Sequence, residues 1–159
     1  MYAVWDDGPG IGGSRLRFAR ATDQGATWKG IGAAAGGAMP GVTDSGSPEL
    51  AVASDGTVYI VWTATDSIKL VKSTDGGESF TTPALVASGI ATLDAAGLPA
   101  PEGFPEHFRV GTLAAVCVGR ADTVVVAWPD CRDGVSRIYC RRSADGGSSW
   151  PVPGRGSRC

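Results

Sequence analysis

The chain contains one eight-residue phrase written three times, at residues 21–28 (ATDQGATW), 73–80 (STDGGESF) and 143–150 (SADGGSSW). Every copy has an aspartate at its third position, a glycine two residues later and an aromatic residue at its end. Recurrence of one unit along a chain indicates a repeat architecture, in which neighbouring units bury their apolar faces against one another. The phrase therefore predicts three copies of one structural part.

A strand-like segment ending in tryptophan precedes each phrase, at residues 2–5 (YAVW), 58–62 (VYIVW) and 124–128 (VVVAW). Short apolar runs rich in β-branched and aromatic residues, separated by turn signals, are typical of β-strands. The repeated unit is thus a β-hairpin followed by a turn. The sequence predicts an all-β fold with almost no helix.

The central unit has the clearest pattern. Asp55-Gly56 lies between two apolar runs and predicts a hairpin turn, because glycine adopts positive φ without a steric cost. Together with the flanking runs it predicts one four-stranded antiparallel sheet, with strands at residues 49–53, 57–63, 68–73 and 84–87. The third unit repeats the pattern at residues 112–118, 123–128 and 137–142, and the first unit opens at its second strand.

Two longer segments interrupt this pattern, residues 30–47 and 87–108. The first is rich in glycine and alanine and has no phosphate-binding motif, so we expect it to be a flexible connection between units. The second carries Pro99, Pro101 and Pro105, and loops of this length are commonly functional or mobile.

The repeated phrase resembles the Asp-box of the sialidase-like (BNR repeat) β-propellers, over nearly the whole chain apart from its long internal loop. The resemblance implies an incomplete β-propeller of about two and a half four-stranded antiparallel blades. It divides one propeller segment into a partial blade (residues 1–46), a full blade plus long loop (47–107) and a second partial blade (108–159).

Propellers usually close with about four to eight blades, so this chain is not expected to close a ring alone. We expect a fragment of a longer protein, because both ends cut through a blade and leave open sheet edges. The alternatives are a protomer that assembles with copies of itself and an open stack.

The repeated aspartates favour a structural role, because an enzyme rarely needs three copies of one acid. A short carboxylate at a turn accepts hydrogen bonds from backbone N–H groups just ahead of it, and the glycines allow the tight backbone. We expect the final aromatics to pack between adjacent sheets, and the hairpin tryptophans Trp5, Trp62 and Trp128 to lie in the core. The predicted structural residues are Asp23, Gly25, Trp28, Asp75, Gly77, Phe80, Asp145, Gly147 and Trp150.

Candidate catalytic residues follow from the same resemblance. Phe108-Arg109-Val110 is similar to the phrase that carries the family's first arginine, and residues 128–134 (WPDCRDG) are similar to the loop that carries its second arginine and catalytic aspartate. The resemblance thus implies that Arg109 and Arg132 bind a substrate carboxylate, which arginine forks do bidentately. It implies that Asp133 is the acid/base.

The alternative is that each arginine is an ordinary solvated or paired side chain. Tyr2, Tyr59 and Tyr139 all lie within predicted strands, so the nucleophile of a catalytic parent is expected outside these residues. The resemblance implies a glycan-directed protein whose parent is an exo-α-sialidase cleaving terminal sialic acid. The alternative function is a non-catalytic module that binds carbohydrate or protein, or a scaffold.

Composition narrows the remaining function classes. The 159 residues have 43% hydrophobic content and a formal net charge of −2, which gives no field that attracts nucleic acid or an acidic membrane. No apolar run approaches the roughly 20 residues needed to cross a bilayer. We expect a glycan or sialoside ligand, self-association or the remainder of a longer propeller as partner, and secretion, with any signal peptide upstream.

The four cysteines, Cys117, Cys131, Cys140 and Cys159, include no CxxC pair, so we expect no metal and no cofactor. A disulfide between Cys131 and Cys140 would close a predicted hairpin and indicate an oxidising compartment. Thiols, including a buried Cys117 in an apolar strand, are the alternative, because sequence does not choose among the possible connectivities.

Overall fold

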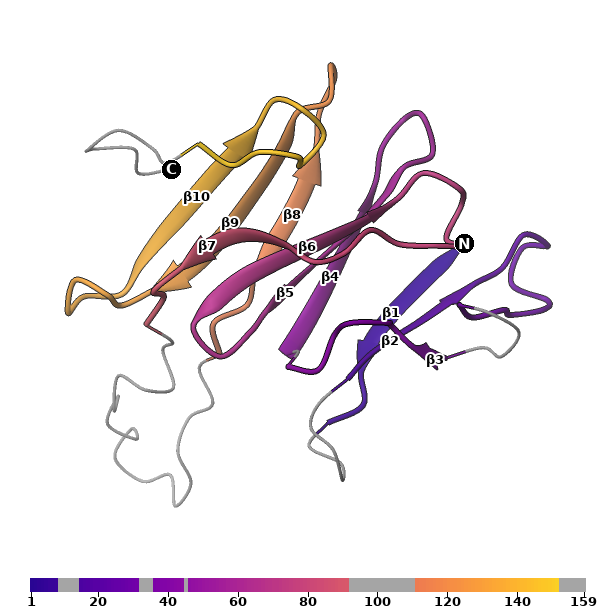
Figure 1. The fold of residues 1–159 in the computed structure, drawn as a ribbon, viewed down its shortest axis with the longest axis horizontal. Coiled ribbons are helices and arrows are strands. Elements are labelled where there is room, and N and C mark those ends of the chain that lie inside the picture. The colour runs from indigo at the N-terminus through magenta and orange to yellow at the C-terminus, as the bar shows by residue number, and fades with distance from the viewer. Residues whose placement is uncertain (9–14, 32–35, 45, 92–110, 152–159) are drawn as a thin grey trace.

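The computed structural model describes residues 1–8, 15–31, 36–44, 46–91 and 111–151. These residues form ten β-strands and no helix. The strands make three separate antiparallel sheets, which stand side by side in chain order (Figure 1). The all-β prediction is confirmed, and no helix in the described part of the chain is long and apolar enough to cross a membrane.

The first sheet contains β1 (Tyr2–Asp6), β2 (Leu16–Arg20) and β3 (Gly37–Ala38) in that order. Strand β3 lies within residues 30–47, which the sequence predicted to be a flexible connection, so that prediction is wrong for this part. The backbone of Gly37 and Ala38 pairs with Phe18 and Arg17 of β2. Main-chain pairing needs no apolar side-chain pattern, which is why no pattern in the sequence predicts this strand.

The middle sheet contains β4 (Gly46–Val52), β5 (Val58–Thr63), β6 (Ser67–Ser73) and β7 (Ala84–Ser88) in consecutive order. The predicted four-stranded sheet is confirmed. In the turn between β4 and β5, Gly56 has φ +90° and the carboxylate of Asp55 accepts the N–H of Thr57 at 2.9 Å. The predicted Asp55-Gly56 hairpin turn is therefore present.

The third sheet contains β8 (Ala115–Val118), β9 (Val124–Asp130) and β10 (Arg137–Ser143), with β9 in the centre. Strand β9 continues two residues beyond Trp128, where the sequence predicted its end. The backbone of Asp130 pairs with Arg137 and that of Pro129 with Ile138. The continuation places Asp130 inside the sheet, and the following turn carries Arg132 and Asp133.

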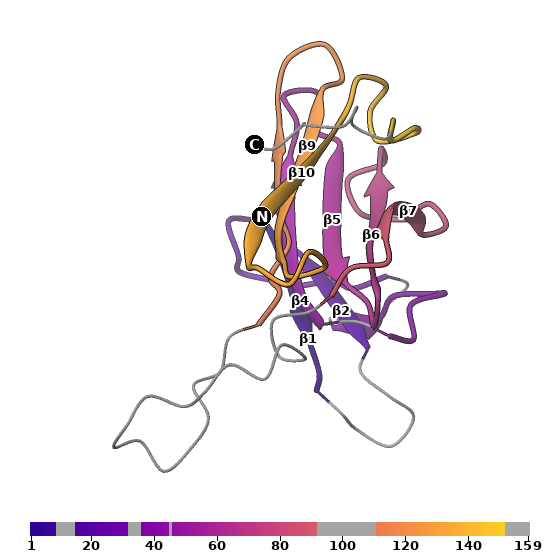
Figure 2. The same cartoon turned by 90° about the vertical axis from the view of Figure 1, so that its left-hand side faces the viewer.

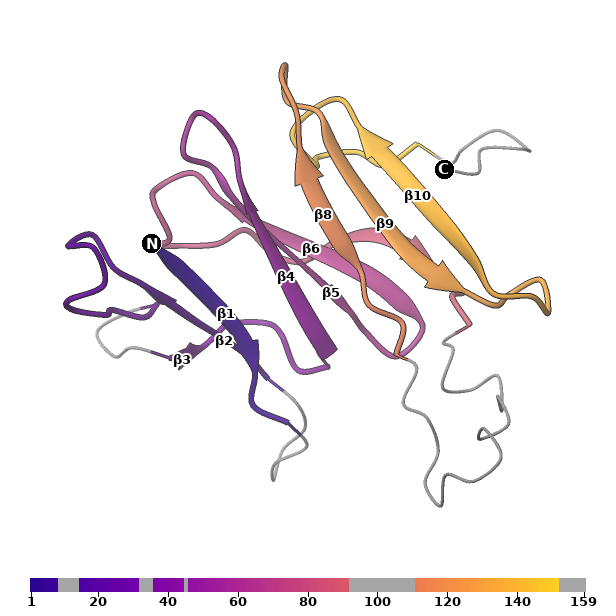
Figure 3. The same cartoon turned by 180° about the vertical axis from the view of Figure 1, so that it is seen from behind.

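Each pair of neighbouring sheets encloses one hydrophobic cluster. Strand β4 contacts both β1 and β8, so the first strands of the three sheets lie next to one another (Figure 3). Trp62 is fully buried between the first and middle sheets, and Trp128 is 3% exposed between the middle and third sheets. Burial of these aromatic and aliphatic side chains is the main favourable contribution to the packing of the sheets.

The outer face of the first sheet departs from the sequence prediction. Trp5 is 41% exposed and Trp28 is 38% exposed, so the expectations of a core Trp5 and of a Trp28 packed between sheets are wrong. Among the described residues no sheet covers this side, because the first sheet packs only on the middle sheet. Phe80 and Trp150, in contrast, pack against the two clusters between sheets.

The strands run so that turns of one kind gather at one end of the sheets. The repeated turns after β6 and β10 lie at the same end as the turns after β4 and β8, as Figure 2 shows for β8 and β10. The turn after β9, with Arg132 and Asp133, lies at the opposite end. We call these the repeated-turn end and the Arg132 end.

Candidate functional site

The repeated aspartates are fully engaged by their own turns. In the middle copy, Asp75 Oδ1 accepts the backbone N–H groups of Glu78 and Ser79, both at 3.0 Å, and Asp75 Oδ2 accepts the Ser79 hydroxyl. Asp145 makes the same bonds to Ser148 and Ser149. In the first copy the Asp23 carboxylate accepts both the N–H and the hydroxyl of Thr27.

These hydrogen bonds stabilise the ionised carboxylates. The Ser79 hydroxyl, with further donors in the turn, holds the pKa of Asp75 well below its ordinary value, and the Ser143 hydroxyl leads the same effect on the pKa of Asp145. Such a carboxylate is a poor proton donor or acceptor near neutral pH. The turns therefore use their aspartates to order the backbone.

The glycines of the turns allow close approach to the preceding sheet. Gly77 has φ +87°, and a Cβ there would lie 2.7 Å from the Phe18 ring of the first sheet. Gly25 and Gly147 have positive φ as well, at +92° and +77°. The ring of Phe80 then packs edge-on against Phe18 with centroids 4.9 Å apart. Glycine and aromatic residue together lock the turn onto the sheet before it.

At the Arg132 end, a buried carboxylate organises the turn after β9. Asp130 is completely buried and accepts the backbone N–H of Arg132 at 2.9 Å, its Nε at 2.7 Å and the indole N–H of Trp128 at 3.2 Å. The N–H of Ala91, which follows β7, also binds it at 3.1 Å. Burial raises the pKa of Asp130, but the Arg132 side chain and the other donors outweigh burial and lower it.

The guanidinium of Arg132 is held by two contacts. Its Nε and Nη2 both donate to Asp130, and its central carbon lies 5.0 Å from the centre of the Tyr139 ring, a cation–π distance. The Tyr139 hydroxyl donates to the carboxylate of Asp133. This bond, with burial a lesser cause, raises the pKa of Tyr139.

The structure thus brings two of the predicted site residues into one cluster, composed of Asp130, Arg132, Asp133 and Tyr139. Arg109 lies outside the described residues, so its place relative to the cluster is not described. Sequence reasoning missed Tyr139 and Asp130 as members. Tyr139 lies opposite Trp128 because β9 and β10 pair on to Asp130 and Arg137, two residues beyond the predicted end of β9, so the predicted strand ends carried no signal for it.

Chemically, the cluster offers a carboxylate and a phenol that are hydrogen-bonded to each other beside a positive charge. Arg132 and Asp133 are exposed, so both polar groups are accessible to a ligand at this end. The exposed acid and guanidinium can bind the hydroxyl groups of a sugar, while the Tyr139 ring lies beneath Arg132 and stacks with Trp128.

The cysteines differ from two of the expectations. Cys140 is disulfide-bonded, whereas the thiol of Cys131 donates to the backbone oxygen of Ala91 at 3.2 Å, so the Cys131–Cys140 cross-link is not formed. Cys117 is a thiol on β8 but is exposed, because alternation along the strand directs it to the outer face of the third sheet. Cys159 lies outside the described residues.

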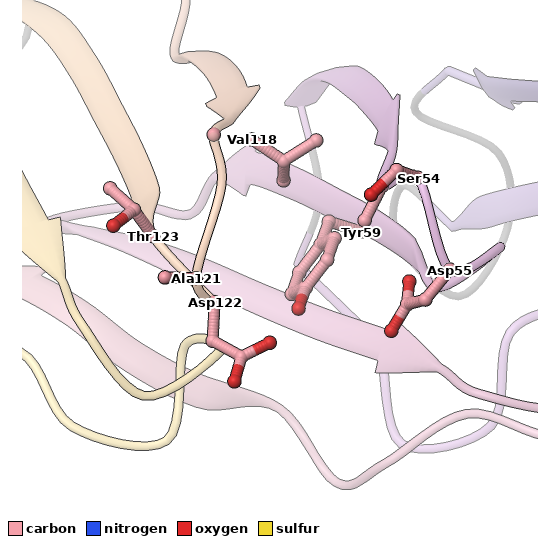
Figure 4. A pocket seen from close by; sticks show the side chains of 9 residues that line it. Ser54, Asp55, Tyr59, Val118, Ala121, Asp122 and Thr123 are labelled. Carbon is pink, nitrogen blue, oxygen red and sulfur yellow. The ribbon is translucent and has the colours of Figure 1, made fainter.

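A small hollow lies at the repeated-turn end, between the β4–β5 and β8–β9 turns (Figure 4). Asp55, Tyr59 and Asp122 line its polar side, and burial, followed by the charges of Asp55 and Asp122, raises the pKa of Tyr59. Its volume of about 110 Å³ is well below the roughly 300–1,000 Å³ of small-molecule sites. Within the described ranges no group of three or more potential ligands could hold a metal ion.

Comparison with known proteins gives similarity at the level of fold. The sequence matches no protein-family model and no curated protein. Among solved structures, a protein of unknown function from Dyadobacter fermentans is similar with a TM-score of 0.60 and 14% identity, over 94% of this chain and 36% of that one. A Hadza microbial sialidase is similar with a TM-score of 0.52 and 17% identity, over 86% of this chain and 30% of that one.

An ulvan lyase, at a TM-score of 0.46 and 14% identity, is too distant to support an argument. The chain spans about a third of the length of the first two structures, at 36% and 30%. Identity of 14–17% establishes a shared arrangement of β-sheets and leaves activity open. The fold of this chain is sialidase-like in that sense.

Proposed function

We propose that the chain supplies sheets to a sialidase-like β-propeller directed at glycans, and that the sugar binds at the Arg132 end. The observation that carries the proposal is the cluster of Arg132, Asp133 and Tyr139. It joins an exposed acid, a phenol and a guanidinium at the end opposite the repeated turns, whose own aspartates are occupied. In this proposal the turns are Asp-boxes, and the three sheets are blades within residues 1–46, 47–107 and 108–159.

In the catalytic form of the proposal, the complete protein hydrolyses terminal sialic acid. Asp133 is the acid/base, Arg109 and Arg132 bind the sugar carboxylate, and the nucleophile comes from outside this chain. The Tyr139 hydroxyl donates to the Asp133 carboxylate, so in this form of the proposal the phenol orients the acid/base at the Arg132 end.

A non-catalytic binding module is the second candidate, and one observation favours it. Arg132 already directs two of its N–H groups at buried Asp130, so its fork is not open for bidentate binding of a second carboxylate. A preformed cluster of paired polar groups suits recognition of sugar hydroxyls.

Secretion belongs to the same proposal. The disulfide at Cys140 fits an oxidising compartment, which glycan-directed proteins outside the cell occupy. Mass spectrometry of the protein secreted from its own cells would test this assignment.

Turnover of a fluorogenic sialoside and binding to a glycan array separate the two candidates. For hydrolysis, the Arg109→Ala/Asp133→Ala variant should lose turnover by about 100-fold or more. The matched control Arg120→Ala/Asp122→Asn changes exposed residues of the β8–β9 turn, at the repeated-turn end, and should keep it.

Binding without turnover, weakened by Asp133→Asn or Tyr139→Phe and not by Asp122→Asn, would establish the binding module instead. A folded protein that neither binds nor cleaves any glycan on the array would contradict the glycan assignment altogether.

A further inference from the structure

The two interfaces between sheets are built from equivalent residues. In the first interface, Arg20 of β2 donates to the backbone oxygen of Gly76 at 3.2 Å. In the second, Lys72 of β6 donates to the backbone oxygen of Gly146 at 2.7 Å. The strand partners of Arg20 and Lys72 are tyrosines, Tyr2 and Tyr59. A cation on one sheet thus reaches the repeated turn of the next sheet in both cases.

The apolar parts of the two interfaces are equivalent as well. A branched aliphatic residue lies four positions before each of these cations, Leu16 in β2 and Ile68 in β6, and both are completely buried. Leu16 shares a cluster with Trp62, and Ile68 shares one with Trp128. Each interface therefore joins an aliphatic face of one sheet to a tryptophan face of the next.

Among the described residues, each end of the stack carries one half of this interface without the other half. On the third sheet, Ile138 is the equivalent of Leu16 and Ile68, four positions before Arg142, yet it is 55% exposed. On the first sheet, Trp5 is the equivalent of Trp62 and Trp128, yet it is 41% exposed. The first and third sheets stand at opposite ends of the stack (Figures 1 and 3), so the aliphatic half lies at one end and the tryptophan half at the other.

We propose that the outer face of the third sheet docks against the outer face of the first sheet of a second copy of this chain. We define the outer face of the third sheet by Val125, Ala127, Ile138 and Arg142, which lie around the disulfide-bonded Cys140, and the outer face of the first sheet by Trp5, Gln24 and Trp28. The inference concerns the packing of sheets and does not rest on the glycan proposal.

A difference in side-chain size at two equivalent positions indicates that a second copy of this chain covers the first sheet. A Cβ at Gly146 would lie 3.3 Å from the Tyr59 hydroxyl, and a Cβ at Gly76 would lie 3.8 Å from that of Tyr2, so a side chain in this place would crowd the tyrosine. In the first repeated turn the same place is Gln24, which has φ +60° like the two glycines. A sheet that covers the first sheet therefore needs a smaller residue than tyrosine as the strand partner of its cation.

The third sheet has the required neighbour. Val125 pairs with Arg142 where Tyr2 pairs with Arg20 and Tyr59 with Lys72. A valine is shorter than a tyrosine by the whole ring, which makes room for the Gln24 side chain. In the single chain the exposed Arg142 donates to the Thr123 hydroxyl at 3.2 Å. Its other N–H groups can donate to the backbone oxygen of Gln24 in the second copy, as Arg20 and Lys72 do to Gly76 and Gly146.

The contact is heterologous, since different faces of the two copies meet. Two copies of three sheets each fall within the range of about four to eight sheets that close a propeller ring. Closure would cover both exposed faces of each copy at once, and two identical interfaces would form.

The mass of the protein in solution tests the docking. By analytical ultracentrifugation under non-reducing conditions, which keep the Cys140 disulfide, the wild type should approach twice the 16.2 kDa of one chain as concentration rises. Ile138→Arg should raise the dimer dissociation constant by about tenfold or more. Leu85→Arg is the matched control, because Leu85 on β7 is also 55% exposed and should leave it unchanged.

Labelling of the wild type provides a second readout that needs no variant. Cys117 lies opposite Val125 on the outer face of the third sheet, so its alkylation, followed by peptide mass spectrometry, should slow as concentration rises. The thiol of Cys131 at the Arg132 end is the internal control. A wild type with the mass of one chain and unchanging Cys117 labelling at every concentration would overturn the proposal, as would equal effects of Ile138→Arg and Leu85→Arg.

Discussion

At the residue scale, hydrogen-bond donors decide what each carboxylate of this chain can do. Asp75 and Asp145 accept hydrogen bonds from the amides and hydroxyls of their own turns. Within the described part of the chain, Asp133 accepts a side-chain hydrogen bond only from the phenol of Tyr139. The same residue type is therefore structural at the repeated-turn end and available to a ligand at the Arg132 end.

The repeated aspartates should make stability depend on acid pH. Asp75 has a lowered pKa in the folded protein and an ordinary value of 3.8, so its stabilisation is complete above that value and declines as pH falls below it. We expect Asp75→Asn to lower the melting temperature by about 2–8 °C near neutral pH.

The difference from the wild type should shrink as the pH falls below 3.8, because the unfolded wild-type protein takes up the proton first. Thermal melts across this range, with Asp122→Asn as a control on an exposed carboxylate, would measure it. A pH-independent difference would show that the charge of Asp75 does not matter.

Tyr139 should report the charge of Asp133. The hydrogen bond to the Asp133 carboxylate is the largest cause of the raised pKa of Tyr139. Asp133→Asn should therefore lower this pKa, so that the tyrosinate absorbance of Tyr139 appears at lower pH. Titration of the wild type and of this variant, each beside its Tyr139→Phe counterpart, isolates the Tyr139 curve in the ultraviolet absorbance. Identical curves would mean that the two side chains are not hydrogen-bonded in solution.

At the element scale, the sequence predicted the strands whose apolar pattern is strong and missed those defined by the backbone. Residues 58–63 and 67–73 alternate between two buried faces and were recognisable from β-branched residues alone. Strand β3 has no such pattern, and β9 runs on through Pro129, which strand rules treat as an end. Register, which placed Tyr139 over Trp128, follows from pairing that a single strand does not encode.

The packing of elements predicts how strongly single side chains matter. Ile68 on β6 is completely buried between the middle and third sheets, so Ile68→Ala should lower the free energy of unfolding by about 2–5 kcal/mol. Leu85→Ala on the neighbouring strand β7 removes an exposed side chain and should change it by about 0.5 kcal/mol or less. Urea unfolding of both variants at low protein concentration checks the contrast, and similar losses would place Ile68 outside the core.

At the scale of the whole molecule, the exposed ends follow from the number of sheets and not from any one sequence unit. Trp5, Trp62 and Trp128 occupy the same position in three hairpins, which is why the sequence predicted one environment for all of them. Trp62 and Trp128 are each buried by the sheet that precedes their own. Among the described residues no sheet precedes the first one, so Trp5 is exposed. Local sequence cannot show which copy of a repeat stands at an end.

Fluorescence quenching should distinguish these environments across the whole molecule. Of the five tryptophans, Trp5 and Trp28 are the exposed ones, so a neutral quencher such as acrylamide should act mainly on their emission in dilute solution. Trp5→Phe/Trp28→Phe should remove most of the quenchable signal, whereas Trp128→Phe should remove signal that resists quenching. If the docking of a second copy is correct, the quenchable fraction of the wild type should also fall as concentration rises. Quenching that is unchanged in the Trp5→Phe/Trp28→Phe variant would mean that the first sheet is covered even in the single chain.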